Sequence, residues 1–132
     1  MKKNYVFFIA DDDQDDQELF ISALQQIDES CICITAINGE EALNKLFDAE
    51  IKLPDFIFLD LNMPKINGKQ CLEKIKQHKN LQDIPVIIYS TSANEKEANE
   101  LSQMGATMFM QKPNRFSDLF NALEKIVHYN WN

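Results

Sequence analysis

Charged and hydroxylic residues follow four of the apolar runs in this sequence. Asp11 and Asp12 come directly after the first run and Asp60 after the third, whereas Ser90 and Lys112 come after the fourth and the fifth. If these positions met in space, they would combine three carboxylates with a hydroxyl and an ammonium. Such a set could supply a nucleophile and also compensate the charge of a phosphoryl group that it receives.

Three carboxylates in one crevice would call for a cation. At separations of about 5 Å and an effective dielectric near 20, each pair repels by roughly 3 kcal/mol. All-oxygen ligands suit a hard ion, and a site with few protein ligands leaves positions for water and phosphate oxygens. We therefore expect Mg²⁺ to bind at this site and to help neutralise the transferred group.

Five apolar, β-rich runs alternate with segments of helical period, and these elements must position the polar residues. The runs span residues 5–10, 31–37, 55–59, 84–89 and 106–110, and most are continuously apolar, as in strands covered on both faces. Between them lie apolar stripes with helical spacing, such as those from Leu19 to Ile27 and from Ala42 to Phe47. This alternation predicts an open, doubly wound α/β domain with a parallel sheet, whose strand ends form one functional edge.

The composition limits the function classes. The chain has 132 residues, which fit a single domain spanning residues 1–132, and its net charge is -8. Such an acidic balance argues against binding to nucleic acid or to anionic lipid, and no segment has transmembrane length. Cys31, Cys33 and Cys71 form no disulfide or metal framework, so we interpret them as reduced thiols of a cytoplasmic protein.

Four motifs, in order along the chain, resemble those of the response-regulator receiver family. They are residues 7–12, residues 58–64 with Gly68, residues 84–90, and Lys112-Pro113 after Gly105-Ala106. The resemblance extends from about Tyr5 to Tyr129. It implies a flavodoxin-like (β/α)5 fold with the strand order 2-1-3-4-5 of the chemotaxis regulator CheY.

The resemblance also implies roles at the acidic end of the site. Asp60 matches the phosphoacceptor aspartate of the family. Asp12 would bind Mg²⁺ directly and Asp11 through water, while Asp60 would give an oxygen and Asn62 its backbone carbonyl.

Other roles concern signal transmission. Ser90 matches the switch hydroxyl that turns to the phosphoryl group, and Lys112 would pair with the phosphate. The resemblance also suggests a cis bond between Lys112 and Pro113. Phe109 matches the switch aromatic, although the residue alone fits a core aromatic nearly as well.

Three positions concern access to the phosphate and its lifetime. Thr91 stands where many family members have alanine, which would narrow access to the phosphoryl group. Ser92 and Asn62 occupy positions that tune dephosphorylation in the family. The sequence therefore predicts a transient aspartyl phosphate without fixing its lifetime.

The function implied is that of a receiver in a two-component phosphorelay. A histidine kinase or a phosphotransfer protein would give its phosphoryl group to Asp60, so the chain would be a phosphoacceptor rather than an enzyme with a separate substrate. Because no second domain follows Tyr129, we expect the output to be binding to a downstream target protein.

Other interpretations of the acidic residues fit less well. An EF-hand could begin at Asp11, but its required Gly would be Asp16 and its closing Glu would be Ser22. Asp13, Asp15 and Asp16 are interpreted as favouring a helix N-terminus through the helix dipole.

Two further classes stay as alternatives. A phosphatase of the haloacid dehalogenase type would need the pattern Asp-x-Asp-x-Thr or Asp-x-Asp-x-Val after a strand, together with a cap domain. Asp60-x-Asn62 and Asp11-x-Asp13-x-Asp15 both depart from this pattern. A pseudo-receiver that binds partners without phosphorylation is disfavoured because all the acidic, hydroxyl and lysine positions are intact. Turnover of a phosphomonoester would favour the phosphatase. Failure to bind Mg²⁺ or beryllofluoride would favour the pseudo-receiver.

Overall fold

A computed structural model describes residues 4–91 and 94–128 of the chain. Five strands alternate with five helices, and the strands form one parallel sheet in the order β2-β1-β3-β4-β5. The strands are β1 (Val6–Ala10), β2 (Ile32–Ala36), β3 (Phe56–Leu59), β4 (Val86–Ser90) and β5 (Met108–Gln111). The helices are α1 (Gln14–Ile27), α2 (Gly39–Leu46), α3 (Gly68–Gln77), α4 (Glu95–Gln103) and α5 (Phe116–His128).

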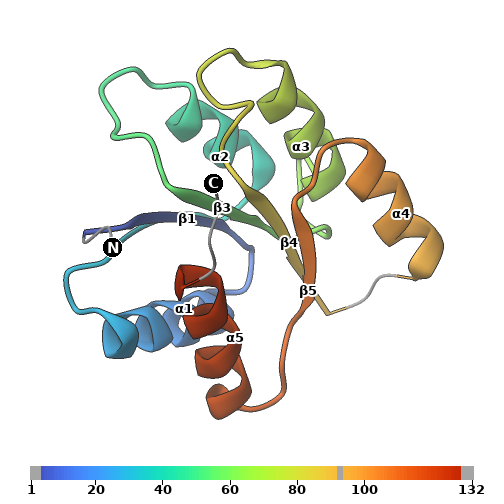
Figure 1. Ribbon diagram of the computed structural model, residues 1–132. Helices are drawn as coiled ribbons and strands as arrows, with labels where there is room; N and C mark the ends of the chain where they lie inside the picture. Colours follow the sequence, from blue (N-terminus) through green and yellow to red (C-terminus); the bar gives the residue numbers. More distant parts are fainter. Residues whose placement is uncertain (1–3, 92–93, 129–132) are drawn as a thin grey trace.

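The helices cover both faces of the sheet. Figure 1 shows α1 and α5 on one side and α2, α3 and α4 on the other. Side chains of β1 alternate between the two faces, since Phe7 and Ile9 pack in the cluster beneath α1 and α5, whereas Phe8 and Ala10 pack in the opposite cluster. The predicted doubly wound fold and its strand order are therefore confirmed.

The predicted boundaries differ from the observed ones in small ways. The last two strands end one residue later than expected, so Ser90 and Gln111 are the final residues of β4 and β5.

Two helix residues are more exposed than predicted. Leu19 and Phe47, assigned to buried stripes, are 48% and 42% exposed. Those two assignments were wrong because α1 buries the face of Phe20, Ala23 and Leu24, and because α2 already ends at Leu46.

Polar side chains start four of the helices directly after the loops that follow the strands. Asp13, Asn38, Asn67 and Asn94 each accept a hydrogen bond from a backbone N–H in the first turn of α1, α2, α3 and α4. At α3 the cap is reciprocal, because Gln70 also accepts from the N–H of Asn67. These caps fix where each chain segment leaves the edge of the sheet.

Among the described residues, no helix is both long and apolar enough to span a bilayer.

Candidate phosphoacceptor site

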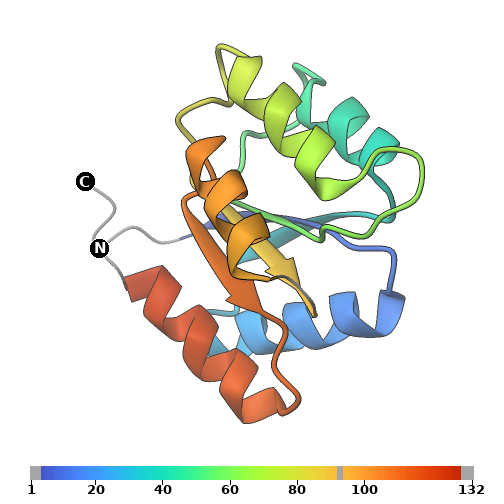
Figure 2. The ribbon, with the colours of Figure 1, turned by 90° about the vertical axis from the view of Figure 1, so that its right-hand side faces the viewer.

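The carboxyl ends of four strands meet at one edge of the sheet. Asp11 follows β1, Asp60 follows the adjacent β3, Ser90 ends β4 and Lys112 follows β5. Figure 2 shows the ends of β4 and β5 side by side. Parallel pairing thus brings together residues that lie up to 101 positions apart, as their places at the strand ends predict.

Lys112 is the centre of this group. Its Nζ lies 2.7 Å from Asp11 Oδ2, 2.9 Å from Asp16 Oδ2 and 3.0 Å from Asp60 Oδ2, and only 8% of its side chain is exposed. The backbone N–H of Lys112 donates to the carbonyl of Ser90 at 2.9 Å, which anchors the residue to β4. The ammonium also lies 5.5 Å from the ring centre of Tyr89.

The carboxylates keep this lysine charged. Burial alone would lower the pKa of Lys112, but its contacts with Asp11, Asp16 and Asp60 raise that pKa above its ordinary value. Burial also raises the pKa of the Asp11 carboxyl from 3.8 to about 6, although the Lys112 ammonium opposes the shift. The site therefore holds a permanent cation beside an unusually basic carboxylate.

Asp60 is held by its own loop and by the start of α3. Its side chain is buried, with Oδ1 accepting from the N–H of Asn62 at 3.1 Å and Oδ2 from Lys112 at 3.0 Å. Gly68 lies against its backbone so closely that an added Cβ would come within 2.2 Å of the Asp60 carbonyl oxygen. Glycine is required at this position because the two chain segments pass in direct contact.

Three carboxylates gather where a cation could bind. Oxygens of Asp11, Asp12 and Asp60 lie within 4.8 Å of one another, with Asp12 and Asn62 exposed at the rim. Oδ2 of Asp11 is fully buried and has no hydrogen-bond partner, although it forms an ion pair with Lys112. A buried oxygen with an unused lone pair and an all-oxygen donor set fit a hard divalent ion such as Mg²⁺.

Ser90 and Thr91 form the hydroxyl side of the site. Ser90 is fully buried, and Thr91 beside it is exposed. Ser92, named above for dephosphorylation, lies outside the described residues. The peptide bond between Lys112 and Pro113 is trans, so the expected cis bond is wrong for this structure. The trans form needs no special context, since an X–Pro bond favours it by about 0.5–1 kcal/mol.

Phe109 lies on β5, two residues before the last residue of the strand, Gln111. It is half-buried and packs against the core cluster that contains Ile88 and Leu101. The same three residues line a cavity of about 90 Å³ between β4, β5 and α4, together with Ala98, Ser102, Ala106, Thr107 and Met108. The ring thus borders free space on the core side.

The sequence analysis did not assign two residues of this site. Asp16 was interpreted as a helix-end charge, but it pairs with Lys112. Gln17 is buried and donates from Nε2 to the carbonyls of Asp11 and Ala36. Both lie one turn before Phe20 on α1 and therefore on the helix face that packs against the sheet. The helical period that predicted this buried face could also have predicted that these two residues lie near the site.

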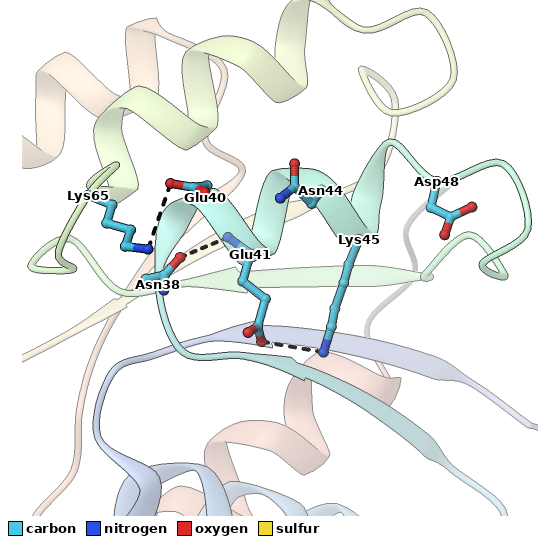
Figure 3. Close-up of a pocket in the computed structure, with 7 residues that line it drawn as sticks. All are labelled: Asn38, Glu40, Glu41, Asn44, Lys45, Asp48 and Lys65. Carbon is cyan, nitrogen blue, oxygen red and sulfur yellow. Dashed lines mark hydrogen bonds and ion pairs between the residues drawn. The ribbon is translucent and has the colours of Figure 1, made fainter.

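A second hollow lies along α2, and the carboxylates of the candidate phosphoacceptor site are not among the residues that line it. It has a volume of about 450 Å³ and is lined by Asn38, Glu40, Glu41, Asn44, Lys45, Asp48 and Lys65. Figure 3 shows that its charges pair with one another, Glu40 with Lys65 at 3.9 Å and Glu41 with Lys45 at 3.4 Å. We interpret this hollow as a solvated, salt-bridged surface.

Comparison with known proteins agrees with the geometry. The chain is 28% identical over 128 residues to a probable C4-dicarboxylate response regulator, DctR, of Bacillus subtilis, which covers 97% of this chain and 54% of that regulator. It spans 54% of the length of DctR and 34% of the length of a protein-glutamate methylesterase/protein-glutamine glutaminase of Clostridium acetobutylicum, to which it is 32% identical over 121 residues. These two relatives are therefore longer proteins of which the chain matches one part.

Solved structures share the whole fold. The Mn²⁺-bound form of response regulator Rcp1, a protein of Synechocystis, superimposes with a TM-score of 0.84 at 27% identity, covering 95% of this chain and 93% of that one. The phosphorylated cyanobacterial phytochrome response regulator RcpA superimposes with a TM-score of 0.85 at 31% identity. The match covers 93% of this chain and 91% of the RcpA chain. The sequence profile of the response regulator receiver domain matches residues 7–124. The chain therefore belongs to the response regulator receiver domain family of two-component signal transduction.

Proposed function

We propose that Asp60 accepts a phosphoryl group from a phosphohistidine of a histidine kinase or a phosphotransfer protein, in a reaction that depends on Mg²⁺. The observation that carries this proposal is the contact of 3.0 Å between Asp60 Oδ2 and Lys112 Nζ, with Asp11 and Asp12 gathered beside it. A buried nucleophile is thus adjacent to a fixed cation and to two further oxygen ligands.

The transfer would proceed by direct displacement at phosphorus. An Asp60 carboxylate oxygen forms the new bond to phosphorus, while the bond between phosphorus and the donor's imidazole nitrogen breaks and leaves its electron pair on that nitrogen. The Lys112 ammonium compensates charge on the phosphoryl oxygens. The N–H of Asn62, which donates to Asp60 Oδ1, helps to hold the nucleophile in place.

Four residues would hold the metal ion. In this proposal Asp12, Asp60 and the carbonyl of Asn62 bind it directly, and Asp11 binds it through water. When bound, Mg²⁺ would neutralise negative charge and polarise the phosphoryl oxygens. The fully buried Asp11 Oδ2, which lacks a hydrogen-bond partner, supports this assignment.

The signal would leave through α4, β5 and α5. Ser90 would turn its hydroxyl toward the new phosphoryl group, and the Phe109 ring would move into the neighbouring cavity of about 90 Å³. Met108 on β5 and Phe116 on α5, each 36% exposed, offer apolar contact area to a downstream protein. In this proposal residues 1–132 act as one domain that switches protein binding without turning over a substrate of its own.

The direct test is phosphorylation by a small donor. Incubation with Mg²⁺ and acetyl phosphate is expected to add one phosphoryl group by mass spectrometry, and Asp60→Asn is expected to abolish it. Asp15→Asn, an exposed carboxylate on α1, is the matched control and should label like the wild type. Equal labelling of Asp60→Asn and the wild type would overturn the assignment.

A further inference from the structure

Asp16 is a third carboxylate partner of the lysine at the site. Its Oδ2 accepts a hydrogen bond of 2.9 Å from Lys112 Nζ across 96 residues of sequence. The contact brings the first turn of α1 to the end of β5, two elements that are not neighbours in the chain. It therefore ties α1 to the residue that faces the phosphoacceptor.

The ammonium of Lys112 is already surrounded by anionic partners. It donates hydrogen bonds to Asp16 Oδ2 at 2.9 Å and to Asp60 Oδ2 at 3.0 Å, and it forms an ion pair with Asp11 Oδ2 at 2.7 Å. Because a lysine carries only three N–H groups, a phosphoryl group on Asp60 would compete with these carboxylates for the ammonium.

Asp16 is the partner that gives way most easily. Its side chain is 30% exposed, compared with 0% for Asp11 and 8% for Asp60. Water can hydrate the Asp16 carboxylate once the lysine leaves, whereas a buried carboxylate would lose its compensation.

We propose that Asp16 is a positioning residue that holds Lys112 before phosphorylation and competes with the phosphoryl group for it afterwards. It thereby lowers the affinity of the site for a phosphoryl group. The inference rests on the proposed function of Asp60 and adds a residue that sets how tightly the phosphorylated state is held.

The position of Asp16 is fixed by the start of the helix. Its backbone N–H donates to the capping carboxylate of Asp13 at 3.1 Å, which orients the first turn of α1. Asp15, one residue earlier in the same turn, is exposed and is not among the carboxylates that contact Lys112. Asp15→Asn therefore removes the same charge from the same turn without touching the lysine contact.

The test measures beryllofluoride binding, a mimic of the phosphoryl group, by calorimetry at saturating Mg²⁺. Asp16→Asn is expected to bind roughly fivefold more tightly than the wild type, the effect of about one exposed charge-assisted contact. Asp15→Asn should stay within about twofold of the wild type, and Asp16→Glu, which keeps a carboxylate, should restore the wild-type affinity.

A second measurement needs no phosphoryl mimic. In the free protein, the NMR signal of the Lys112 ammonium should shift and its protons should exchange faster in Asp16→Asn, and not in Asp15→Asn. A general loss of folding would not single out this ammonium.

The outcomes separate the two proposals. If the wild type binds beryllofluoride and Asp16→Asn binds no more tightly than Asp15→Asn, the role of Asp16 is wrong while that of Asp60 stands. If the wild type binds no more beryllofluoride than Asp60→Asn does, both are overturned.

Discussion

The side-chain amide of Gln17 donates a hydrogen bond of 2.7 Å to the backbone carbonyl of Asp11. A second bond, of 2.8 Å, runs from the same nitrogen to the carbonyl of Ala36, which also accepts from the N–H of Asp11. One buried glutamine therefore joins α1 to the ends of β1 and β2. It holds the backbone from which the Asp11 carboxylate enters the site.

Replacing this glutamine should weaken both the fold and the metal site. In Gln17→Leu the buried carbonyl of Asp11 loses its donor, so we expect a loss of about 1–3 kcal/mol in the free energy of unfolding. Mg²⁺ affinity should fall as well, because the Asp11 backbone is less firmly placed. Urea unfolding and calorimetry measure the two effects. Gln25→Leu, on the exposed face of α1, is the control, and equal losses in both variants would contradict the role of Gln17.

Lys112→Met should make the site depend on divalent ions. Without the ammonium, the buried Asp11 and Asp60 carboxylates lose their compensation, and we expect the metal-free protein to lose about 3–5 kcal/mol in unfolding free energy. Removal of a positive charge should tighten Mg²⁺ binding by at least about tenfold. Urea titrations with chelator and with Mg²⁺ test this, and the exposed Lys96→Met serves as the control. A variant whose stability does not respond to Mg²⁺ would count against the metal site.

The fold followed from periodic patterns, and most of the site followed from the fold. Continuous apolar runs identified the five strands, and the rule that parallel strands end at one edge placed Asp11, Asp60 and Lys112 together before any contact was known. Their roles in phosphoryl transfer and metal binding stay predictions. These residues could be placed from the sequence because each directly follows, or nearly follows, a strand, so that only the end of that strand had to be predicted.

Contacts from the helices were harder to predict. Asp16 and Gln17 enter the site because α1 presents one face to the sheet. A shift of one residue in the register of the helix would put Asp15 and Asp16 in their places. Leu19 shows the same sensitivity, since it was assigned to the buried face and is exposed. The cap at Asp13, which sets this register, was read only as a favourable charge.

Gly68→Ala should disturb the phosphoacceptor without touching its side chain. The new Cβ would meet the Asp60 carbonyl oxygen at 2.2 Å and the Leu61 Cα at 2.9 Å, so the loop after β3 must shift. We expect a loss of about 1–3 kcal/mol in unfolding free energy, despite the better helix propensity of alanine, and slower labelling by acetyl phosphate. Lys69→Ala, at the exposed next position of α3, is the control. Wild-type labelling by a Gly68→Ala protein would show that this close approach does not place Asp60.

The raised pKa of Asp11 predicts how Mg²⁺ binding depends on pH. Burial raises this pKa from 3.8 to about 6, so below pH 6 the metal-free carboxyl holds a proton that a cation must displace. Affinity should therefore be constant well above pH 6 and fall by up to about tenfold per unit below it. A carboxyl with an ordinary pKa would move this decline in Mg²⁺ affinity to below about pH 4.

Calorimetric titration with Mg²⁺ between about pH 5 and 8 measures the profile. Asp11→Asn should bind more weakly and lose the decline near pH 6, while Asp15→Asn should keep it; an unchanged profile in Asp11→Asn would assign the titration to another group.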